Sequence, residues 1–346
     1  MRIKEAKRDI MKHIASMEAG NEPISPMLWS APGIGKSALV YQIAEEIGAE
    51  VREVRLLLYK PTDITGYPML NKETNRATFA RPEFLPDEDD TRRYILFFDE
   101  ITAAPPSTQA AAYQAAYGRQ IGPHRFPKNA FVVFAGNRTT DRGVAYTMPS
   151  PLANRVAHME LECNLDDWKE WAMEHTVHPL VISFLNFRQD LLYKFPDGLD
   201  FRGFPTPRTW EMTSDILHQH GGAEENETMI HSVIGEGTGI EFTAFARLAG
   251  KVPDANKILD GDFQEVDDKQ PDVFYALSGS LVYNLQHNLS QERMDNFIKY
   301  NIDHMPADFS FLSMRDALAA KLQRHMIQSP MFTEFTKKNS HFKLEL

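Results

Sequence analysis

The sequence predicts an α/β fold in which a three-layer αβα domain is followed by an all-α domain. Three observations support this prediction. A short apolar run leads into a glycine loop and then into a helical pattern, between about residues 26 and 48. Continuous apolar runs, typical of strands buried on both faces, recur at 94–98 and 131–134 and alternate with helical patterns. After about residue 161 such runs disappear and helical patterns dominate.

Size and charge limit the possible classes of protein. The chain has 346 residues, more than one typical domain, and 42% of them are hydrophobic, which is enough for a sizeable core. We expect one domain over 1–162 and a helical one over 163–346. The formal net charge of −11 argues against a surface built mainly to hold nucleic acid. The single cysteine, Cys163, excludes an intrachain disulfide and a cysteine zinc cluster.

The N-terminal part of the sequence carries no sign of a membrane or secretory segment. No apolar run approaches the roughly 18 residues that a membrane-spanning helix needs, and the charged N-terminal segment lacks the apolar region of a secretory leader. Residues 3–19 instead predict an amphipathic helix that ends at Gly20. We therefore expect a cytoplasmic protein that does not insert into membranes.

Apolar runs, and the prolines and glycines that interrupt them, predict the other elements of the first domain. A buried strand is predicted over 51–58 and a loop or helix start over 60–66. A small hairpin insertion is predicted over 67–85, where prolines flank short apolar pieces. The segment Pro105-Pro106-Ser107 opens an alanine-rich helix that stops at Gly118.

A short strand over 158–161 ends the first domain, and the remainder has helical patterns. Polar breaks near 221–228 and 260–271 separate its segments. Two sets of apolar residues each share a predicted helix face, namely Phe274, Leu277, Leu281 and Leu285, and likewise Leu318 and Leu322. The stretch 261–346 carries no motif, and we expect it either to dock a partner or to add packing to the helical domain.

The most informative segment is a glycine loop that follows the apolar run ending at Trp29 and precedes a helix. In such a loop, backbone N–H groups and a helix N-terminus cradle phosphate, while Lys36 reaches the outer phosphates and the Ser37 hydroxyl binds Mg²⁺. Ser30 stands where this motif usually has its first glycine. The residues expected to bind the nucleotide are Pro32, Gly33, Ile34, Gly35, Lys36, Ser37 and Ala38.

Polar residues follow both predicted central strands. Asp99 and Glu100 come directly after the first, where a buried carboxylate is costly unless it meets a cation such as nucleotide-bound Mg²⁺. We therefore expect Asp99 and Ser37 to hold Mg²⁺, and Glu100 to orient or deprotonate the attacking water. Asn137 follows the second strand, where its amide is expected to position water against the γ-phosphate, although Gly-Asn is also common in turns.

Together these features resemble the AAA+ ATPases, and most closely their MoxR-type branch, over roughly residues 1–260. The resemblance implies a Walker A motif at Lys36 and Ser37, a Walker B motif at Asp99 and Glu100, and a sensor 1 at Asn137. The segments that carry the resemblance are 31–37, 97–101, 135–137, 149–155 and 205–210. In addition, 78–86 resembles the end of an insertion in helix 2, and 118–128 resembles the hairpin before sensor 1.

The resemblance also implies roles for two arginines. Arg155 matches the arginine finger, which acts on the ATP of a neighbouring subunit, and Arg208 matches sensor 2, which contacts the γ-phosphate in its own subunit. An arginine fork suits the negative charge that spreads during phosphoryl transfer. The family has Asp-Arg-Phe where this chain has Asn154-Arg155-Val156, so Arg138 and Arg142 stay open as alternatives for the finger.

The function implied by the resemblance is that of a ring, usually a hexamer, which binds ATP and Mg²⁺ and hydrolyses ATP to ADP and phosphate. The energy remodels or activates a protein partner, as in a chaperone, and such ATPases often act with a partner of von Willebrand factor A type. Two alternatives stay open. One is a nucleic-acid motor of the helicase or branch-migration type, which the acidic charge disfavours. The other is a nucleotide-gated binding module with little turnover.

Overall fold

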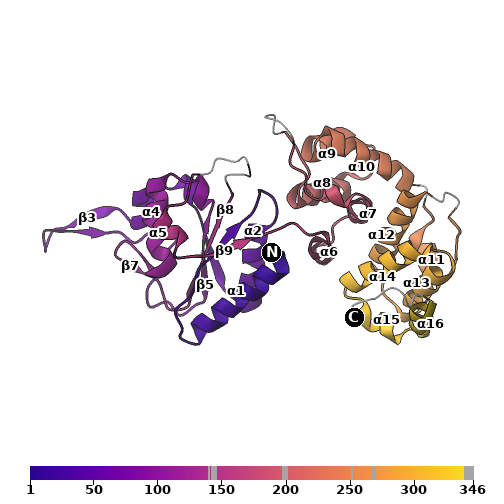
Figure 1. Cartoon of the computed structure of the whole chain (residues 1–346), viewed down its shortest axis with the longest axis horizontal. Coiled ribbons are helices and arrows are strands. Elements are labelled where there is room, and N and C mark those ends of the chain that lie inside the picture. Colours follow the sequence, from indigo (N-terminus) through magenta and orange to yellow (C-terminus); the bar gives the residue numbers. More distant parts are fainter. Residues whose placement is uncertain (139–140, 142–145, 197–201, 251, 267–269, 339–346) are drawn as a thin grey trace. The chain divides into compact units, whose positions relative to one another are not determined.

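The computed structural model describes residues 1–138, 141, 146–196, 202–250, 252–266 and 270–338. The chain divides into two compact units, Met1–Cys163 and Asn164–Leu346. The first unit is built around a sheet flanked by helices, and the second is all-helical in its described part (Figure 1). Among the described helices, none is long and apolar enough to cross a lipid bilayer.

A parallel five-stranded sheet forms the centre of the first unit, with the strand order β2-β5-β8-β1-β9. Because β5 and β8 lie inside the sheet and are covered on both faces, every one of their residues is buried, as the apolar runs predicted. The strands are β1 (Pro26–Trp29), β2 (Glu50–Arg55), β5 (Tyr94–Asp99), β8 (Ala130–Gly136) and β9 (Ala157–Glu160).

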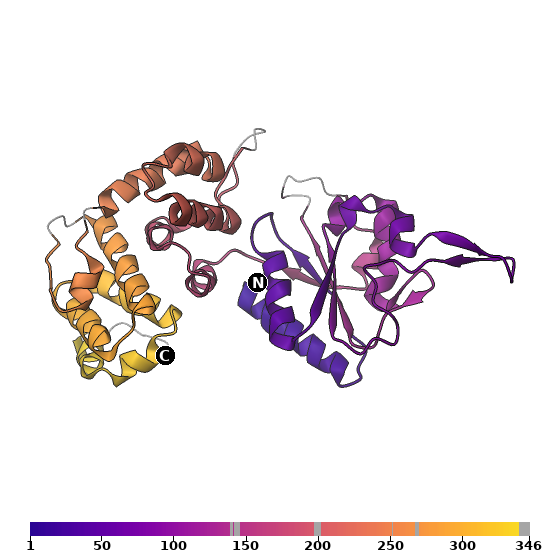
Figure 2. The same cartoon turned by 180° about the vertical axis from the view of Figure 1, so that it is seen from behind.

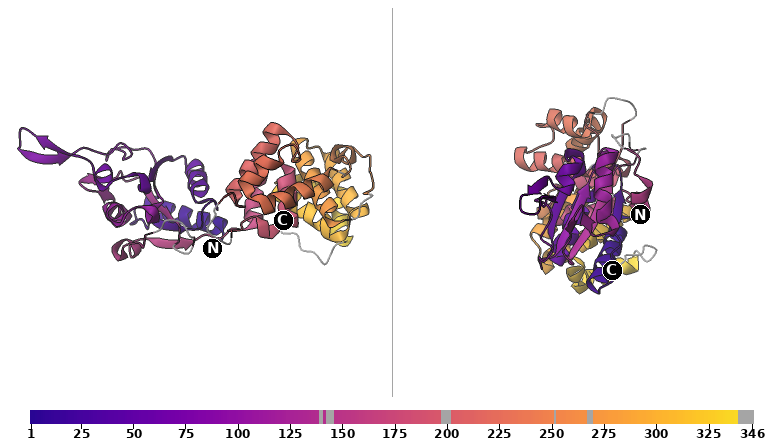
Figure 3. Two further views of the ribbon diagram at one scale, coloured as in Figure 1. Left: turned by 90° about the horizontal axis from the view of Figure 1, so that it is seen from above. Right: turned by 90° about the vertical axis from the view of Figure 1, so that its left-hand side faces the viewer.

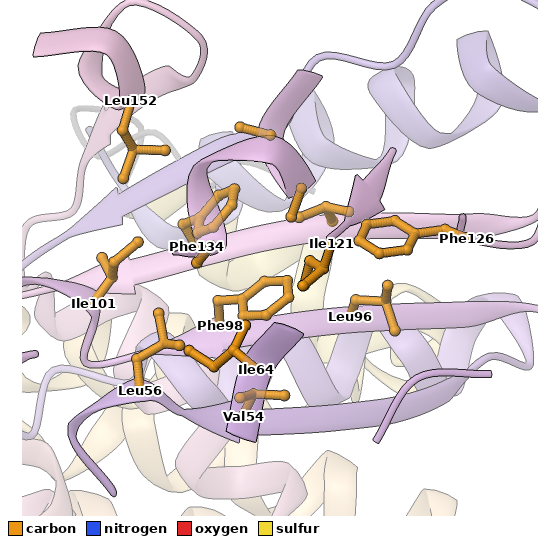
Figure 4. Close-up of a cluster of buried hydrophobic side chains, with 14 of the residues drawn as sticks. Val54, Leu56, Ile64, Leu96, Phe98, Ile101, Ile121, Phe126, Phe134 and Leu152 are labelled. Carbon is orange, nitrogen blue, oxygen red and sulfur yellow. The ribbon is translucent and has the colours of Figure 1, made fainter. Parts of the chain in front are cut away.

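Helices cover both faces of this sheet, so the predicted three-layer αβα arrangement is confirmed (Figure 2). Alternate strand residues divide between the faces: Ile95 and Phe97 pack with the helices α1 (Ile3–Glu18) and α2 (Lys36–Ile47), whereas Leu96 and Phe98 pack on the opposite face. Figure 4 shows the second of these cores, in which Phe98 stacks on Phe134 at 5.3 Å between ring centroids. The helices are α1 (Ile3–Glu18), α2 (Lys36–Ile47), α3 (Pro61–Thr65), α4 (Pro106–Tyr117) and α5 (Ser150–Ala153).

The predicted strand over 51–58 is wrong at its end. Strand β2 stops at Arg55, which pairs with Asp99, and Leu56–Leu58 form the short 3₁₀ helix η1. Only Leu56 of these leucines is buried, while Leu58 is 75% exposed. The apolar run therefore leaves the sheet where its partner strand β5 ends, because no further backbone groups are available for pairing.

Two small hairpins extend from the first unit. Strands β3 (Pro68–Asn71) and β4 (Arg76–Phe79) pair antiparallel inside the segment 67–85, and their strand residues are largely exposed (Figure 1). Strands β6 (Gln120–Ile121) and β7 (His124–Arg125) form the second hairpin. Arg81, which follows β4, connects the two hairpins, because its guanidinium donates to the carbonyl oxygen of Arg125 on β7 at 2.8 Å. The exposed apolar side chains of the first hairpin are Tyr67, Met69, Leu70 and Phe79.

The second unit packs its helices around α12, which contacts α7, α10, α11 and α14 (Figure 3). The described helices are α6 (Leu165–Glu174), α7 (Pro179–Phe187), η4 (Gln189–Leu191), α8 (Pro207–His220), α9 (Glu227–Ile234), α10 (Glu236–Ala249), α11 (Ala255–Leu259), α12 (Pro271–His287), α13 (Gln291–Asp303), α14 (Ala307–Ala319), α15 (Gln323–Gln328) and α16 (Pro330–Lys338). The four residues predicted to share one face of α12 are buried, as expected. Leu318 and Leu322 do not share a helix, because α14 ends at Ala319 and Lys321 has a positive φ of 60°.

A polar cluster lies in the interior of the second unit. The Lys169 ammonium on α6 donates to the side-chain oxygen of Asn186 on α7 at 3.0 Å and forms a close ion pair with Asp316 on α14. Asn186 in turn donates to the second carboxylate oxygen of Asp316 at 2.8 Å. All three side chains are buried. This set, called the Lys169 cluster below, joins a helix of the stretch 261–346 to the first helices of the unit.

Candidate functional site

The parallel sheet places three polar segments at one edge. Strand β8 lies between β5 and β1, so the residues that follow these three strands are neighbours at their carboxyl ends. The glycine loop follows β1, Asp99 ends β5, and Asn137 follows β8. The structure therefore brings together the side chains of Lys36, Ser37, Asp99 and Asn137, which are called the Lys36 cluster below.

Two glycines of the loop have left-handed backbone conformations. Gly33 and Gly35 have φ angles of 79° and 115°, in the left-handed region where side chains with a Cβ are strained. Gly35 is the residue immediately before α2, so the loop leads directly to the unpaired N–H groups of a helix of 12 residues. Ile34 is buried and anchors the loop, while Pro32 is half-buried and Ala38 is exposed.

The Lys36 ammonium lies at the centre of the Lys36 cluster. It donates to the side-chain oxygen of Asn137 at 2.7 Å and to the carbonyl oxygen of Ser30 at 2.8 Å. The Ser30 hydroxyl is a third acceptor at 3.1 Å, and the same hydroxyl donates to the carbonyl oxygen of Ala31 at 3.0 Å. The residue that replaces the usual glycine is thus fully buried and contributes two oxygens to Lys36.

Asp99 and Ser37 form the acidic side of the cluster. The Ser37 hydroxyl donates to one carboxylate oxygen of Asp99 at 3.2 Å, and the backbone N–H of Glu100 donates to the other at 2.8 Å. Burial raises the pKa of the Asp99 carboxyl above its ordinary value. The two hydrogen bonds and the Lys36 charge act in the opposite direction but are outweighed. A buried carboxylate beside a hydroxyl is the hard oxygen donor set that Mg²⁺ prefers, so these two residues fit the ion.

Glu100 has an unusual backbone conformation for a residue with a side chain. Its φ of 55° lies in the left-handed region, and such a residue costs on the order of 1–3 kcal/mol unless its surroundings fix it. The hydrogen bond from its N–H to Asp99 contributes to fixing it. The two adjacent acidic residues therefore differ in exposure to solvent: Asp99 is buried and Glu100 is half-buried.

Thr102 is a residue of this site that the sequence analysis missed. Its hydroxyl donates to the carbonyl oxygen of Asn137 and accepts from the backbone N–H of Asn137, both at 3.0 Å. Gly136 allows this approach, because a Cβ there would lie 2.7 Å from the same hydroxyl oxygen. Thr102 therefore fixes the backbone of Asn137 and with it the amide that binds Lys36. No motif marks this threonine, since its role depends on the pairing of two strands.

A charged pair at the edge strand β2 also lies beside Asp99. Glu53 accepts hydrogen bonds from the Tyr41 hydroxyl at 2.8 Å and from the Arg55 guanidinium at 2.7 Å. The Glu53 carboxylate, and to a smaller extent those of Asp99 and Glu100, raise the pKa of Arg55. Arg55 is mostly exposed and adds positive charge next to the acidic strand end.

The candidate arginine fingers differ in their contacts. Helix α5 ends at Ala153 and is capped by Asn154, and Arg155 is the next residue. The Arg155 side chain is exposed. Its guanidinium donates to the carbonyl oxygen of Pro151 at 2.6 Å and lies over the Tyr113 ring, 5.3 Å from the ring centroid. Arg138 is instead held by ion pairs with Asp141 at 3.3 Å and with Glu160 at 3.5 Å. Arg142 lies outside the described residues.

The predicted sensor Arg208 belongs to the second unit. It is the second residue of α8, which begins after Thr206, and its side chain is exposed. The hydroxyl of Thr206 accepts from the N–H of Thr209 at 3.1 Å, which fixes the start of the helix. Within that unit Arg208 lies near Glu211. Burial raises the pKa of the Glu211 carboxyl, and the positive charge of Arg208 partly offsets that rise.

The chain is similar in sequence or in structure to several known proteins. YeaC of Bacillus subtilis (strain 168), an uncharacterized protein, is 30% identical over 117 residues, a match that spans 33% of this chain and 33% of that protein. The Thermotoga maritima RuvB Holliday junction branch migration motor is 15% identical, with a TM-score of 0.35 over 99% of this chain and 95% of that one. NtrX from Brucella abortus in complex with ADP is 11% identical, with a TM-score of 0.38 over 98% of this chain and 68% of that one.

The match to a family model covers the residues that build the site. Residues 26–157 match the model described as "ATPase family associated with various cellular activities (AAA)". This range includes the glycine loop, Asp99, Glu100, Asn137 and Arg155, but not Arg208. The chain therefore contains an AAA-family ATPase domain over residues 26–157.

Proposed function

We propose that this protein is a MoxR-like AAA+ ATPase that binds ATP with Mg²⁺, hydrolyses it in a ring oligomer, and thereby remodels or activates a protein partner. The observation that carries the proposal is the Lys36 cluster. Its four side chains form two hydrogen-bonded pairs at one edge of the sheet, Lys36 with Asn137 and Ser37 with Asp99. This is the set that phosphoryl transfer from a nucleotide requires.

Each residue of the cluster has a distinct role in the proposal. The N–H groups of the loop and of the start of α2 bind the phosphates, and Lys36 neutralises their charge. Ser37 and Asp99 hold Mg²⁺, which supplies a Lewis acid that draws charge from the phosphate oxygens. Asn137, fixed by Thr102, orients water and the γ-phosphate.

Hydrolysis breaks the bond between the γ-phosphorus and the bridging oxygen of ADP. Water attacks the γ-phosphorus, and Glu100 accepts the proton that this water releases. The arginines stabilise the charge that spreads over the transferring group. Arg155 is the proposed finger in trans, because it is exposed and its contacts among the described residues are with a carbonyl oxygen and a ring face, whereas Arg138 is held by two carboxylates. Arg208 is the proposed sensor within the same chain.

A finger that acts in trans requires a ring, and we propose a hexamer. The proposed partner is a protein of von Willebrand factor A type rather than a nucleic acid. The net charge of −11 supports this choice, because proteins bind the phosphates of a nucleic-acid backbone mainly through the positive charges of lysine and arginine. The alternative proposal, a motor of the helicase or branch-migration type, requires a local basic surface that works against this overall charge.

The Glu100→Gln variant tests the proposal directly. We expect ATP to bind with unchanged affinity, while turnover falls by roughly a hundredfold or more because the base is lost. The variant should also retain the ring in the presence of ATP, as measured by light scattering. Turnover at the rate of the natural chain would contradict the role of Glu100, and absence of turnover in the natural chain would favour the binding module.

The same trapped variant distinguishes the two kinds of partner. A tagged Glu100→Gln ring loaded with ATP should retain a protein partner that Lys36→Ala, the matched variant without nucleotide binding, does not retain. Labelled DNA should not bind either ring at low salt. Binding of DNA with a steep dependence on salt concentration would instead support the nucleic-acid motor.

A further inference from the structure

Two aromatic side chains connect the strand before the glycine loop to the segment that carries Arg155. The indole N–H of Trp29 on β1 donates to Nδ1 of His158 on β9 at 2.8 Å. The two rings stack with centroids 5.9 Å apart and an angle of 17° between their planes. The other ring nitrogen of His158, Nε2, lies 2.9 Å from the carbonyl oxygen of Ala153, the last residue of α5.

The chemistry of the two partners fixes the tautomer of His158. An indole nitrogen only donates, so Nδ1 of His158 must accept and carries no proton. A carbonyl oxygen only accepts, so Nε2 must carry the proton and donate to Ala153. Both hydrogen bonds are therefore satisfied by a single form of the neutral imidazole, and each of them depends on the other through that ring.

This pair of hydrogen bonds holds the short segment from which Arg155 projects. Ala153 lies two residues before Arg155, and Asn154 ends the helix by donating from its backbone N–H to the carbonyl oxygen of Ser150 at 3.1 Å. Arg155 is otherwise positioned by Pro151 and by the Tyr113 ring. An arm of four helical residues has too few internal hydrogen bonds to be rigid alone, so a bond to its last carbonyl oxygen limits its movement.

We propose that His158, oriented by Trp29, is a positioning residue that holds Arg155 in the place from which it acts on the neighbouring subunit. The inference rests on the proposed function, in which Arg155 is the finger. Trp29 immediately precedes Ser30, whose carbonyl oxygen binds Lys36. The strand that ends in one subunit's own nucleotide loop is thereby tied to the arm that serves the next subunit's nucleotide.

The Trp29→Phe variant of the full chain tests the inference, because phenylalanine keeps an aromatic ring on His158 but removes the donor. We expect kcat for ATP hydrolysis to fall roughly three- to tenfold, while KM for ATP, ring assembly and melting temperature stay unchanged. His158→Phe, at an exposed position, should give the same result and serves as the test if the first variant folds poorly. Tyr94→Phe is the matched control, since it removes a hydrogen bond to Asp90 at the opposite end of β5.

A double variant shows whether the effect passes through Arg155. In the Arg155→Ala background, Trp29→Phe should cause no further loss of kcat. The inference is overturned if both single variants turn over ATP like the natural chain, if KM rises while kcat stays the same, or if the losses of Trp29→Phe and Arg155→Ala multiply. Normal turnover by Arg155→Ala would contradict both the role of Arg155 as the finger and the role of His158 as its positioning residue, but it would not contradict ATP hydrolysis by the chain.

A measurement without turnover tests the geometry independently. In chain labelled with ¹⁵N-histidine, the His158 nitrogens should show the form protonated at Nε2 only, and Trp29→Phe should shift them toward a mixture of tautomers. A mixture in the natural chain would overturn the link even if every ATPase prediction held. Loss of all ATPase activity in the natural chain, with the expected tautomer present, would contradict the proposed function and with it the role of the link.

Discussion

The Lys36 cluster and the Lys169 cluster have three kinds of side chain in common, yet they differ in what surrounds them. In both, a lysine ammonium binds an asparagine amide oxygen, at 2.7 Å in the first and 3.0 Å in the second, and an aspartate lies beside it. The first lies where strands end in loops, and Lys36 is half-buried. The second joins three helices, and Lys169 and Asp316 are 1% and 0% exposed.

The difference shows that residue types alone do not make a site. In the Lys169 cluster the ammonium and the carboxylate neutralise each other directly, so nothing is left for a ligand. In the Lys36 cluster the ammonium donates to uncharged oxygens of Ser30 and Asn137, and the carboxylate of Asp99 accepts from a hydroxyl and an N–H. Lys36 and Ser37 are also only half-buried, so a phosphate or a metal ion can approach them from solvent.

Replacement of each lysine by methionine is expected to give the largest difference between the two clusters. Lys36→Met should abolish ATP binding, at least about a hundredfold by calorimetry, while the melting temperature stays close to that of the natural chain. Lys169→Met should leave the buried Asp316 charge unpaired and lower the free energy of unfolding by about 3–5 kcal/mol. Equal stability of the two variants in urea would show that the two clusters are not different in kind.

Replacement of each aspartate by asparagine gives a smaller effect of opposite sign. Burial raises the folded-state pKa of Asp99, so between its ordinary and its raised pKa the folded chain binds more protons than the unfolded chain. Without Mg²⁺, stability should therefore fall as the pH rises through this window and stay lower above it.

Asp99→Asn should remove this fall and raise the melting temperature at neutral pH by about 1–3 °C, while Mg²⁺-dependent turnover is lost. Asp316→Asn should lower the melting temperature, because it removes the charge that neutralises Lys169. Melting curves of both variants between pH 4 and pH 8, taken at roughly half-unit steps, measure these changes. A stability loss in Asp99→Asn equal to that in Asp316→Asn would contradict the difference between the two clusters.

The smallest expected effect concerns Ser30, which gives the Lys36 cluster an acceptor that the usual glycine lacks. Ser30→Gly and Ser30→Ala both remove the hydroxyl that binds Lys36, and each should weaken ATP binding by about two- to fivefold. Ser30→Ala keeps the Cβ and so controls for the greater backbone freedom of glycine. Tighter binding by either variant would show that the hydroxyl competes with phosphate instead of orienting the lysine.

The sequence predicted the fold where a signal lies within one segment. Strands β5 and β8 are buried on both faces, so their composition is apolar throughout, and the glycine loop carries Lys36 and Ser37 in a contiguous motif. The end of β2 was wrong because the residues 56–58 are as apolar as a strand, and only the length of β5 shows that pairing stops at Arg55.

Parts of the site that depend on distant partners were not predictable in the same way. Thr102 contacts Asn137 across 35 positions, and Trp29 contacts His158 across 129. Single residues of these types occur throughout the chain, and without the register of the sheet nothing distinguishes them. The Lys169 cluster is a similar case, since lysine and aspartate on helices usually face solvent.

The Lys169 cluster also has a consequence for how the chain is made. Lys169 and Asp316 are separated by 147 positions, so during synthesis the lysine emerges from the ribosome long before its partner does. Until then its ammonium has no counter-charge in the interior, and α6 and α7 have no complete core to enter. The first unit, in contrast, ends at Cys163, before Lys169 is synthesised. Folding is therefore expected to proceed in two stages, with the second unit maturing only after release of nearly the whole chain.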